Sequence, residues 1–423
     1  MRDKELYTQI LGIRSPWRVA DVELSVSTGE VKVLVEQEPG AKRCCPKCGA
    51  VCSGYDQRRR KWRHLDTCQF KTILVAEVPR VECPEHGVVT VKVPWAEPGS
   101  GFTALFEALV IDWLKEASTL AVSRQMKLSW NAIDGIMQRA VRRGLKRREA
   151  HAPKQIGVDE TSFRKRHDYV TVVSDKAGAK VLHVADERTK ESLSGYYESL
   201  SDKQKAAIES VSMDMWPAYI NATLEHIPGA EEKIAFDKFH VAKYLGEALD
   251  KVRRQEHKAL MAQGWEDLKG TKHTWLRNPW NMSTRQWHDF KALRQSTLKT
   301  ARAWAIREFA MSLWGYVSRG WAEKGWRRWL SWAVRSRLAP VKEVAKTIKE
   351  HLWGILNAVV LKVDNGHAES INSRIKTIKV RSRGFRNKER FRNAIYFHLG
   401  GLDLYPAGIN RLILSTTSGE DPI

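Results

Sequence analysis

The spacing of apolar residues changes along the chain and divides it into segments of different type. Apolar and polar residues alternate over 22–26 and again over 31–35, on either side of a turn at 27–30. Alternation with a period of two predicts the two strands of a hairpin. A second hairpin-like region is predicted over 70–81. We therefore expect the first 99 residues to be rich in β-structure.

After a linker rich in proline and glycine, the spacing becomes helical. Ser129 is a good N-cap, and apolar residues recur with helical spacing from Ile133 onward. A helix over 119–126, a turn over 127–129 and a second helix from Trp130 would form a helix-turn-helix. The side chains expected on the groove-facing side of the second helix are Trp130, Asn131, Asp134, Gln138, Arg142 and Arg143. A plain helical spacer between domains is the alternative.

The middle of the chain alternates between strand and helix patterns. The predicted strands are 156–163, 169–174, 180–185, 208–213 and 233–236, with helices over 189–206 and from Pro217. The block 241–350 has almost no strand signal, and 12 of the 17 tryptophans lie between Trp216 and Trp353. The α/β pattern is expected to resume after this block and to continue to about residue 405. We interpret the block as a helical insertion within an α/β domain.

These patterns predict a multidomain α/β protein. The expected segments are a β-rich metal-binding domain (1–99), a helix-turn-helix (100–152), the first part of an α/β core (153–240), the helical insertion (241–350), the second part of the core (351–405) and a tail (406–423).

The charge of the chain indicates a polyanionic partner. It has 71 Lys and Arg against 49 Asp and Glu, a net charge of +22. Nucleic acid is favoured over a membrane surface, because no apolar run has transmembrane length. The N-terminus lacks the apolar core of a signal peptide, so we expect a cytoplasmic, nucleoid-associated protein with no membrane partner.

The six cysteines lie between Cys44 and Cys83. In a reducing compartment such bunching favours a metal site over disulfides. Two C-P-x-C/H knuckles supply the four ligands that tetrahedral zinc prefers, and we expect one structural zinc per chain. The expected ligands are Cys45, Cys48, Cys83 and His86. Four other residues compete with them, namely Cys44, Cys52, Cys68 and His64. A set of buried free thiols is the alternative.

Three carboxylates are candidates for a second metal site. Asp159 lies within the strand predicted over 156–163, Asp214 directly follows the strand predicted over 208–213, and Glu369 opens a basic helix. Carboxylate oxygens are the ligands of Mg²⁺, and a metal pair beside a phosphodiester promotes phosphoryl transfer. Each aspartate alone is more often a helix cap or a surface acid. Asp237 and His240 follow the last predicted strand and are secondary candidates.

The residues after Glu369 carry mostly positive charge. On a helix, Asn372, Lys376 and Lys379 lie near the face of Glu369 and could hold a phosphate beside the metal. Further basic residues are expected to contact the DNA backbone, namely Lys379, Arg381, Arg383, Arg386, Lys388, Arg390 and Arg392. A solvated charged face is the alternative.

The tryptophans of the insertion have a simple structural explanation. Trp326, Trp329 and Trp332 recur every three residues and are expected to fill a helical core. The less favoured interpretation is that one or two of the tryptophans stack on an unpaired base near a DNA end.

Four motifs resemble the DDE transposases of bacterial insertion sequences, specifically the ISL-three family. They are G-V-D-E-T-S-F, V-S-M-D-M-W-P-A-Y, D-K-F-H-V-A-K and D-N-G-H-A-E-S-I-N-S-R-I-K, and the N-terminal layout fits the same family. The resemblance implies a ribonuclease-H-like catalytic core with Asp159, Asp214 and Glu369 as its metal-binding triad. Lys376 fits a lysine position of related enzymes, whereas Asn365 stands where some relatives have arginine.

The function implied is a DNA transposase. It would bind terminal inverted repeats through its N-terminal domains, cleave DNA with two Mg²⁺ ions (Mn²⁺ can substitute) and join the freed end to target DNA. Because two ends must be joined, we expect a homodimer or a larger homo-oligomer on DNA. The alternatives are a zinc-ribbon and helix-turn-helix regulator, and a ribonuclease-H-like nuclease that joins nothing.

Overall fold

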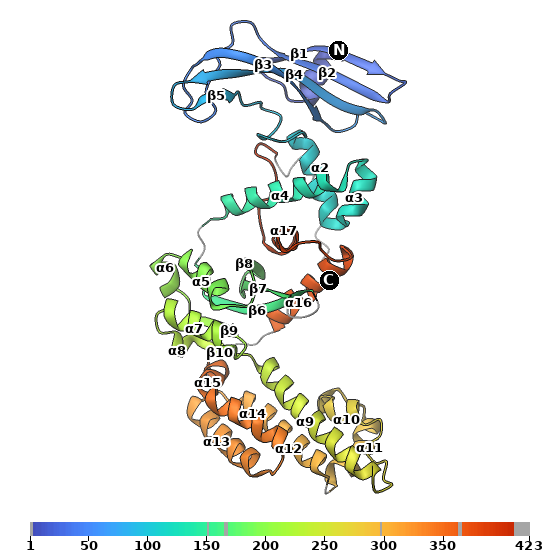
Figure 1. The fold of residues 1–423 in the computed structure, drawn as a ribbon, viewed down its shortest axis with the longest axis vertical. Helices are drawn as coiled ribbons and strands as arrows, with labels where there is room; N and C mark the ends of the chain where they lie inside the picture. Colours follow the sequence, from blue (N-terminus) through green and yellow to red (C-terminus); the bar gives the residue numbers. More distant parts are fainter. Residues whose placement is uncertain (1–2, 150–151, 165–167, 297, 363–365, 410–423) are drawn as a thin grey trace. The chain divides into compact units, whose positions relative to one another are not determined.

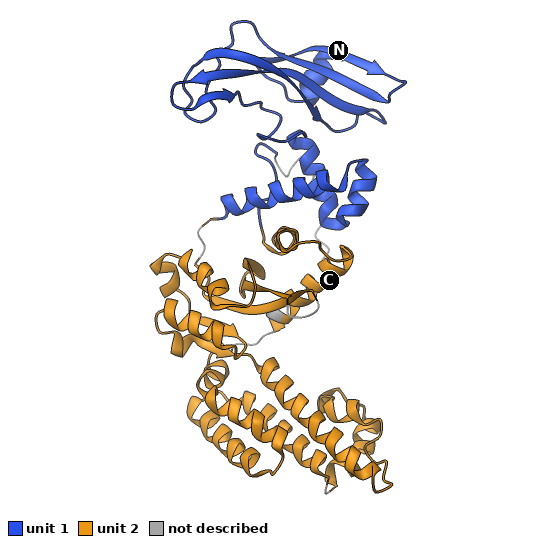
Figure 2. Ribbon diagram, viewed as in Figure 1, with its two compact units in different colours: residues 1–148, 402–423 blue, residues 149–401 orange. Residues whose placement is uncertain are grey.

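The structure is a computed structural model that describes residues 3–149, 152–164, 168–296, 298–362 and 366–409 (Figure 1). The chain forms two compact units. The first unit contains residues 1–148 and 402–423, and the second contains residues 149–401 (Figure 2).

A five-stranded sheet dominates the first unit. The strands are β1 (Trp17–Ser25), β2 (Glu30–Gln37), β3 (Ser53–Arg63), β4 (Lys71–Cys83) and β5 (Gly87–Thr90). Their order is β1-β2-β4-β3 with β5 paired to β4, and only the β2–β4 pair is parallel among the described strands of this sheet. The hairpin expected over 22–35 is confirmed as β1 and β2. The prediction of a hairpin-like region over 70–81 is wrong, because β4 is one strand of 13 residues that pairs with β3 along most of its length.

The core of this sheet is made by alternating apolar residues. Val31, Val33 and Val35 of β2 are buried with Leu74 of β4, and the short helix α1 (Asp3–Ile10) adds a buried tyrosine. Burial of every second side chain is the expected result of period-two alternation on a sheet with one covered face.

Three helices follow the sheet, α2 (Ala104–Glu116), α3 (Thr119–Met126) and α4 (Trp130–Arg147). Each begins after a residue whose hydroxyl accepts a backbone N–H of the first turn, namely Thr103, Ser118 and Ser129. Lys127 ends α3 in the left-handed conformation at φ 52°. The helix predicted over 119–126 and the start of the second helix at Trp130 are confirmed.

The second unit is built on another five-stranded sheet. Its strands are β6 (Gln155–Arg164), β7 (Asp168–Asp175), β8 (Lys180–Asp186), β9 (Ser210–Met213) and β10 (Ile234–Phe236). Their order is β10-β9-β6-β7-β8, in which β6, β7 and β8 are antiparallel and β6, β9 and β10 are parallel. The five strands predicted from the sequence are all present.

Helices pack on both faces of this sheet. They are α5 (Lys190–Glu198), α6 (Asp202–Ala206), α7 (Pro217–His226), α8 (Ala230–Lys233), α16 (Gly366–Arg381) and α17 (Lys388–Leu399). Ile156 and Val158 of β6 belong to a core that includes residues of α5 and α7. Phe163 points to the opposite face of β6, where the centre of its ring lies 5.7 Å from that of Phe391 in α17. Asp159 shares the parity of Phe163, which places it on the face of α16 and α17.

The chain between β10 and α16 is helical throughout its described part. The helices are α9 (Lys238–Met261), α10 (Lys272–Leu276), η1 (Pro279–Asn281), α11 (Thr284–Gln295), α12 (Lys299–Ser312), η2 (Leu313–Gly315), α13 (Arg319–Arg335), α14 (Ala339–Glu350) and α15 (Leu352–Val360). Trp326 and Trp329 are fully buried, as expected, whereas Trp332 is 37% exposed. The prediction that strands resume after residue 350 is wrong, because only helices α15, α16 and α17 occur in the described residues there.

Candidate functional site

Three aspartates of the second unit lie where the parallel pairing of β6, β9 and β10 ends, and we call them the acid row. Asp159 lies within β6, whereas Asp214 and Asp237 directly follow β9 and β10. Gly157 of β6 pairs with Ser212 of β9, and the last residue of β9 pairs with the last residue of β10. Continuing this register places Asp159, Asp214 and Asp237 at the same level across the sheet. Because paired residues of parallel strands point to the same face, the three side chains gather at one sheet end.

Asp159 occupies the central position of this row. One of its oxygens accepts the backbone N–H of Glu160 at 2.8 Å, and the other accepts the amide of Asn372 at 2.5 Å. Burial raises the pKa of Asp159 to about 7, with further increases from the charges of Glu160, Asp214 and Asp237. The site therefore crowds negative charge where little water reaches it.

Asp214 is buried and is neutralised by an arginine that the sequence analysis did not single out. Nη2 of Arg188 donates to Oδ2 of Asp214 at 2.8 Å, and Nη1 lies 3.3 Å from the carboxylate of Glu160. The guanidinium also lies 4.1 Å from the centre of the Trp216 ring, whose indole N–H donates to the Arg188 carbonyl. One arginine in a chain with 71 basic residues gives no sequence signal of this role.

Asp237 and His240 lie at the start of α9. Asp237 is 4% exposed and accepts the backbone N–H of Phe239 at 2.9 Å, so it caps the helix. Nε2 of His240 is 3.7 Å from Oδ2 of Asp237, and burial lowers the pKa of His240. Capping and participation in the row are compatible, because the cap uses only one carboxylate oxygen.

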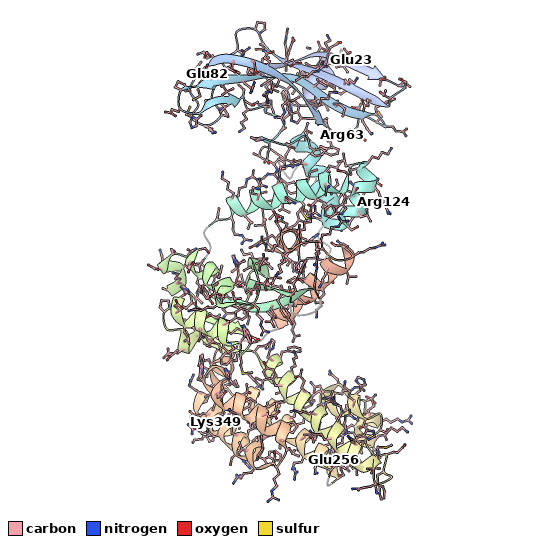
Figure 3. All side chains as sticks on the ribbon, in the orientation of Figure 1. Glu23, Arg63, Glu82, Arg124, Glu256 and Lys349 are labelled. Carbon is pink, nitrogen blue, oxygen red and sulfur yellow. The ribbon has the colours of Figure 1, made fainter. Side chains whose placement is uncertain are left out.

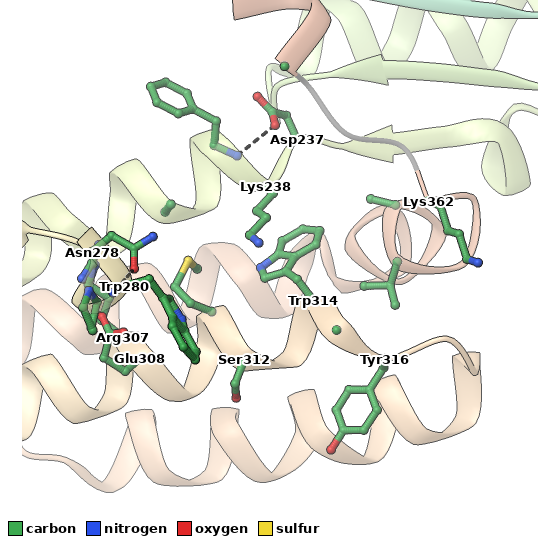
Figure 4. A pocket seen from close by; sticks show the side chains of 18 of the residues that line it. Asp237, Lys238, Asn278, Trp280, Arg307, Glu308, Ser312, Trp314, Tyr316 and Lys362 are labelled. Atoms are coloured by element: carbon green, nitrogen blue, oxygen red, sulfur yellow. Dashed lines mark hydrogen bonds and ion pairs between the residues drawn. The ribbon is translucent and has the colours of Figure 1, made fainter. Parts of the chain in front are cut away.

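Glu369 approaches the row from helix α16. It lies one turn before Asn372, the residue that contacts Asp159, and its side chain is exposed. Glu369 and Asp237 line the same cavity of about 840 Å³, with Lys238, Trp280, Trp314 and Tyr316 on its other walls (Figure 4). We call this cavity the aromatic pocket. In the described part of the chain, the three expected acids do not form a cluster with oxygens within 4.8 Å of one another.

The basic residues after Glu369 lie mainly on the surface. Lys376 is exposed and two turns beyond Glu369, on the same helical face. The Nζ of Lys379 donates to the Ser162 carbonyl at 2.8 Å, so α16 is tied to β6 by this lysine as well as by Asn372. The side chains of Arg381, Arg383 and Arg386 are exposed. Asn365 lies outside the described residues.

The first unit contains a closed group of metal ligands. Cys45 and Cys48 lie in the loop between β2 and β3, and Cys83 and His86 lie at the turn between β4 and β5. Their ligand atoms are within 4.8 Å of one another, with Sγ of Cys48 3.6 Å from Sγ of Cys83, and Nδ1 of His86 3.6 Å from the Cys83 sulfur. Tetrahedral zinc with bonds of about 2.3 Å sets its sulfurs about 3.8 Å apart, so the group fits a structural zinc.

The competing residues are not members of this group, although Cys52 lies near it and interacts with Cys83 and Cys45. His64 is buried, shares a 2.8 Å hydrogen bond with the Thr103 hydroxyl, and burial lowers its pKa to about 4. Cys44 and Cys68 are exposed, and the thiol of Cys52 donates to the Ala50 carbonyl.

The helix-turn-helix exposes part of its expected DNA-facing set. Asn131 and Arg142 are exposed on α4, Trp130 is half-buried, and Gln138 donates to Asp134 at 2.8 Å. Arg124 on the neighbouring α3 is exposed (Figure 3).

Arg143 requires a correction. It was expected to contact DNA, but its side chain is buried and donates to Glu97 at 2.6 Å and to Glu107 at 3.0 Å. It also donates to the carbonyl of Leu404, which holds the returning chain against α4. Its partners come from three different segments, so helical spacing alone does not reveal this interior role.

No helix among the described residues combines the length and apolar character needed to cross a bilayer.

Comparison with known proteins covers nearly the whole chain. The model of the DDE_Tnp_ISL3 family, described as transposase, matches residues 156–395. The helix-turn-helix domain of transposase family ISL3 matches residues 91–141, and the zinc-finger of transposase IS204/IS1001/IS1096/IS1165 matches residues 41–86.

Two curated relatives are similar over most of their length. A transposase for insertion sequence element IS1557 from Mycobacterium tuberculosis is 29% identical over 92% of this chain and 94% of its own. A transposase for insertion sequence element IS1001 from Bordetella parapertussis is 26% identical over 92% of this chain and 97% of its own. With its zinc ribbon, its helix-turn-helix and the acid-bearing segment all matched, the chain belongs to the ISL3 family of transposases.

Proposed function

We propose that this chain binds the terminal inverted repeats of an insertion sequence and catalyses metal-dependent cleavage and transfer of DNA strands. The observation that carries the proposal is the row of Asp159, Asp214 and Asp237 where the parallel pairing of β6, β9 and β10 ends, with helix α16 attached to it by the Asn372–Asp159 hydrogen bond. Glu369 lies one turn before Asn372 on the same helix.

The topology supports a ribonuclease-H-like core. The sheet has three antiparallel strands, β6, β7 and β8, followed in the chain by β9 and β10, which are parallel to β6. In the order β8-β7-β6-β9-β10, strand β6 lies at the centre. Asp159 on this central strand and Asp214 on its parallel neighbour are then adjacent. The helices from α9 to α15 lie between β10 and α16 in the chain, and we assign them as an insertion into this core.

The donor set suits Mg²⁺, with Mn²⁺ as a substitute. Carboxylate oxygens are hard ligands, and burial, with the charges of the neighbouring acids, raises the pKa of Asp159, so a bound cation would stabilise its ionised form. When bound, a metal pair would activate the attacking oxygen and stabilise the leaving oxygen. Asp159 and Asp214 would hold it from the sheet, and Glu369 would complete the set after a shift of α16 or its side chain.

The other residues would position these ligands and the DNA. Asn372 fixes one oxygen of Asp159, and Arg188 balances the charges of Asp214 and Glu160. Lys376 shares a face with Glu369 and would contact a phosphate next to the reacting one. Water attacks phosphorus at the element end and frees a 3′-hydroxyl, whose oxygen then attacks target DNA and displaces a second 3′ oxygen.

Binding of the repeats is assigned to the zinc ribbon and the helix-turn-helix. Asn131, Trp130, Gln138 and Arg142 would contact the groove, and the positive charge after Glu369 would contact the backbone near the cut. The backbone contacts are assigned to Lys379, Arg381, Arg383 and Arg386. Joining two ends requires two bound repeats, so we propose a homodimer or larger homo-oligomer on DNA.

A strand-transfer assay with labelled terminal repeats tests the proposal. Wild-type protein with Mg²⁺ should cleave and join, whereas Asp159→Asn, Asp214→Asn and Glu369→Gln should bind the repeat but leave it intact. Glu389→Gln, at an exposed glutamate of α17, is the matched control and should remain active. Joining by any of the three acid variants would contradict the assignment.

The same assay separates the alternatives. A DNA-binding regulator would bind the repeats without any Mg²⁺-dependent nicking. A nuclease would cleave them and join nothing.

A further inference from the structure

The aromatic pocket has one feature that a folded core does not explain. Trp280 is 94% exposed, whereas Trp275, Trp326 and Trp329 of the same helical block are fully buried. Tryptophan is the side chain with the largest area available for apolar or stacking contact, so nearly full exposure leaves that area unused in the isolated chain.

The backbone holds this ring in a defined place. Trp280 lies in the turn η1, which begins with Pro279, and the side-chain oxygen of Asn278 accepts the Trp280 backbone N–H at 3.1 Å. A proline and a capped turn restrict the conformations of the segment. The ring is thus presented at the pocket by local structure.

The remaining walls of the pocket fit a nucleotide. Trp314 and Tyr316 add aromatic surface, and the indole N–H of Trp314 lacks an acceptor among the described residues. Lys238 and Lys362 also line the pocket and form no ion pair within the described chain, whereas Arg307 is paired with Glu308 at 2.6 Å. Figure 4 shows Trp280 and Lys362 on different sides, with Lys238 and Trp314 between them.

The position of the pocket selects the occupant. Asp237 and Glu369 line it, so a strand whose phosphodiester lies at the acids has its neighbouring nucleotides within reach of the aromatic walls. Bases stack on aromatic rings whatever their identity, and lysines hold the phosphates. The volume of about 840 Å³ lies in the range of pockets that bind small organic groups.

We propose that the aromatic pocket receives an unstacked base of the DNA strand being processed, with the base against Trp280 and its phosphate near Lys238 and Lys362. The inference rests on the proposed function and adds to it a binding site for a single unpaired nucleotide beside the acids. Binding of that nucleotide in the pocket would hold the DNA strand in a fixed position relative to the acid row.

The test uses full-length protein and terminal-repeat duplexes that carry 2-aminopurine at successive positions around the cleaved bond. The fluorescence of this base analogue changes when it leaves the helical stack. One position should respond strongly to wild-type protein and to Asp159→Asn, which binds DNA without cutting it. Trp280→Ala should abolish this response, reduce cleavage by about tenfold, and leave binding of the repeat unchanged.

Two variants control the experiment. Trp280→Phe keeps a stacking surface and should restore most of the response. Trp265→Ala removes another exposed tryptophan of the helical block, 60% exposed and outside the pocket lining, and should behave as wild type. Because Trp280 makes so little contact with the fold, its removal should not change thermal unfolding.

The outcomes distinguish the two proposals. Equal fluorescence and cleavage in wild type and Trp280→Ala would overturn the base pocket while leaving strand transfer intact. Loss of the response in Trp265→Ala to the same degree would also overturn it. If wild-type protein neither cleaves nor joins the repeats, the proposed function itself fails.

Discussion

The zinc group of the first unit and the metal site proposed in the second unit differ in how far their candidate ligands are assembled in the structure. In the first unit, three sulfurs and one imidazole nitrogen already lie within 4.8 Å of one another. In the second unit, Asp159 and Asp214 share a sheet end, but Glu369 projects from a helix toward a cavity. A closed ligand set suits a structural metal, whereas an open one leaves room for substrate.

The two regions also differ in how the charges of their candidate ligands are balanced. Burial, with the charges of the neighbouring acids, raises the pKa of Asp159, and Arg188 and Asn372 contact the carboxylates of Asp214 and Asp159. Such partners hold the acids in place and can yield to a cation. The proposed function requires such an exchange of partners at the acid row, in contrast to the zinc group.

Removal of zinc should have the largest effect. Structural zinc contributes apparent free energies of about 10 kcal/mol or more in small domains. Cys83→Ser removes a buried zinc ligand at the end of β4, beside the turn to β5. The variant should lose zinc, the cooperative unfolding of the first unit, and repeat binding. Elemental analysis and calorimetry measure these changes.

The control for this variant is Cys68→Ser, at an exposed cysteine away from the group. It should keep one zinc per chain. A Cys83→Ser protein with full zinc content and unchanged unfolding would contradict the structural role.

Asp159→Asn should stabilise the protein in the absence of added divalent cation. The folded chain keeps a proton on Asp159 up to about pH 7, whereas the unfolded chain releases it near pH 4. Wild-type stability therefore falls as pH rises between these values. The asparagine variant lacks this fall, so its advantage should be small at pH 5 and at most about 4 kcal/mol at pH 8.

Denaturant unfolding of both proteins at the two pH values measures this advantage. Addition of Mg²⁺ at pH 8 should stabilise the wild type and reduce the difference. An advantage that is equal at pH 5 and pH 8 would show that Asp159 is ionised throughout.

Arg188→Ala should destabilise the acid row by a smaller amount. It leaves Asp214 and Glu160 without their shared cation, and hydrogen bonds to charged groups contribute about 1.5–3 kcal/mol. Burial and Asp214 already raise the pKa of Glu160, and the charge of Arg188 opposes that rise. We expect lower stability at pH 8 and a larger stabilisation by Mg²⁺ than in wild type.

Thermal unfolding with and without Mg²⁺ provides the readout. Arg188→Lys keeps the charge but not the two-pronged geometry and should be intermediate. Stability unchanged by the alanine substitution would remove Arg188 from the account.

Asn372→Ala should have the smallest effect on stability, about 1 kcal/mol, because it removes one partly buried hydrogen bond to Asp159. Its effect on cleavage should be greater than its effect on folding, because Glu369 depends on the placement of α16. Ser373→Ala, at the exposed neighbouring position, is the control. Equal cleavage by the two variants would argue against a positioning role for Asn372.

The features predicted well from the sequence depend on short stretches of chain. The zinc knuckles are local, the limits of α3 and α4 follow from Ser118 and Ser129, and Asp159 and Asp214 could be placed by the strands that carry them. Features that depend on distant partners were missed. Arg143 is buried because Glu97 and Glu107 meet it from other segments. Arg188 becomes important only because the fold brings the segment after β8 to Glu160 of β6 and to Asp214 after β9.

The most direct test of the account locates the metal itself. Crystals of the protein bound to its cleaved repeat, grown with Mn²⁺, would show manganese by anomalous scattering. The account predicts manganese bound by Asp159 of β6 and by Asp214, which follows β9, with a carboxylate oxygen of Glu369 in the same coordination sphere. Manganese bound elsewhere in an active complex, with these acids free of metal, would contradict it.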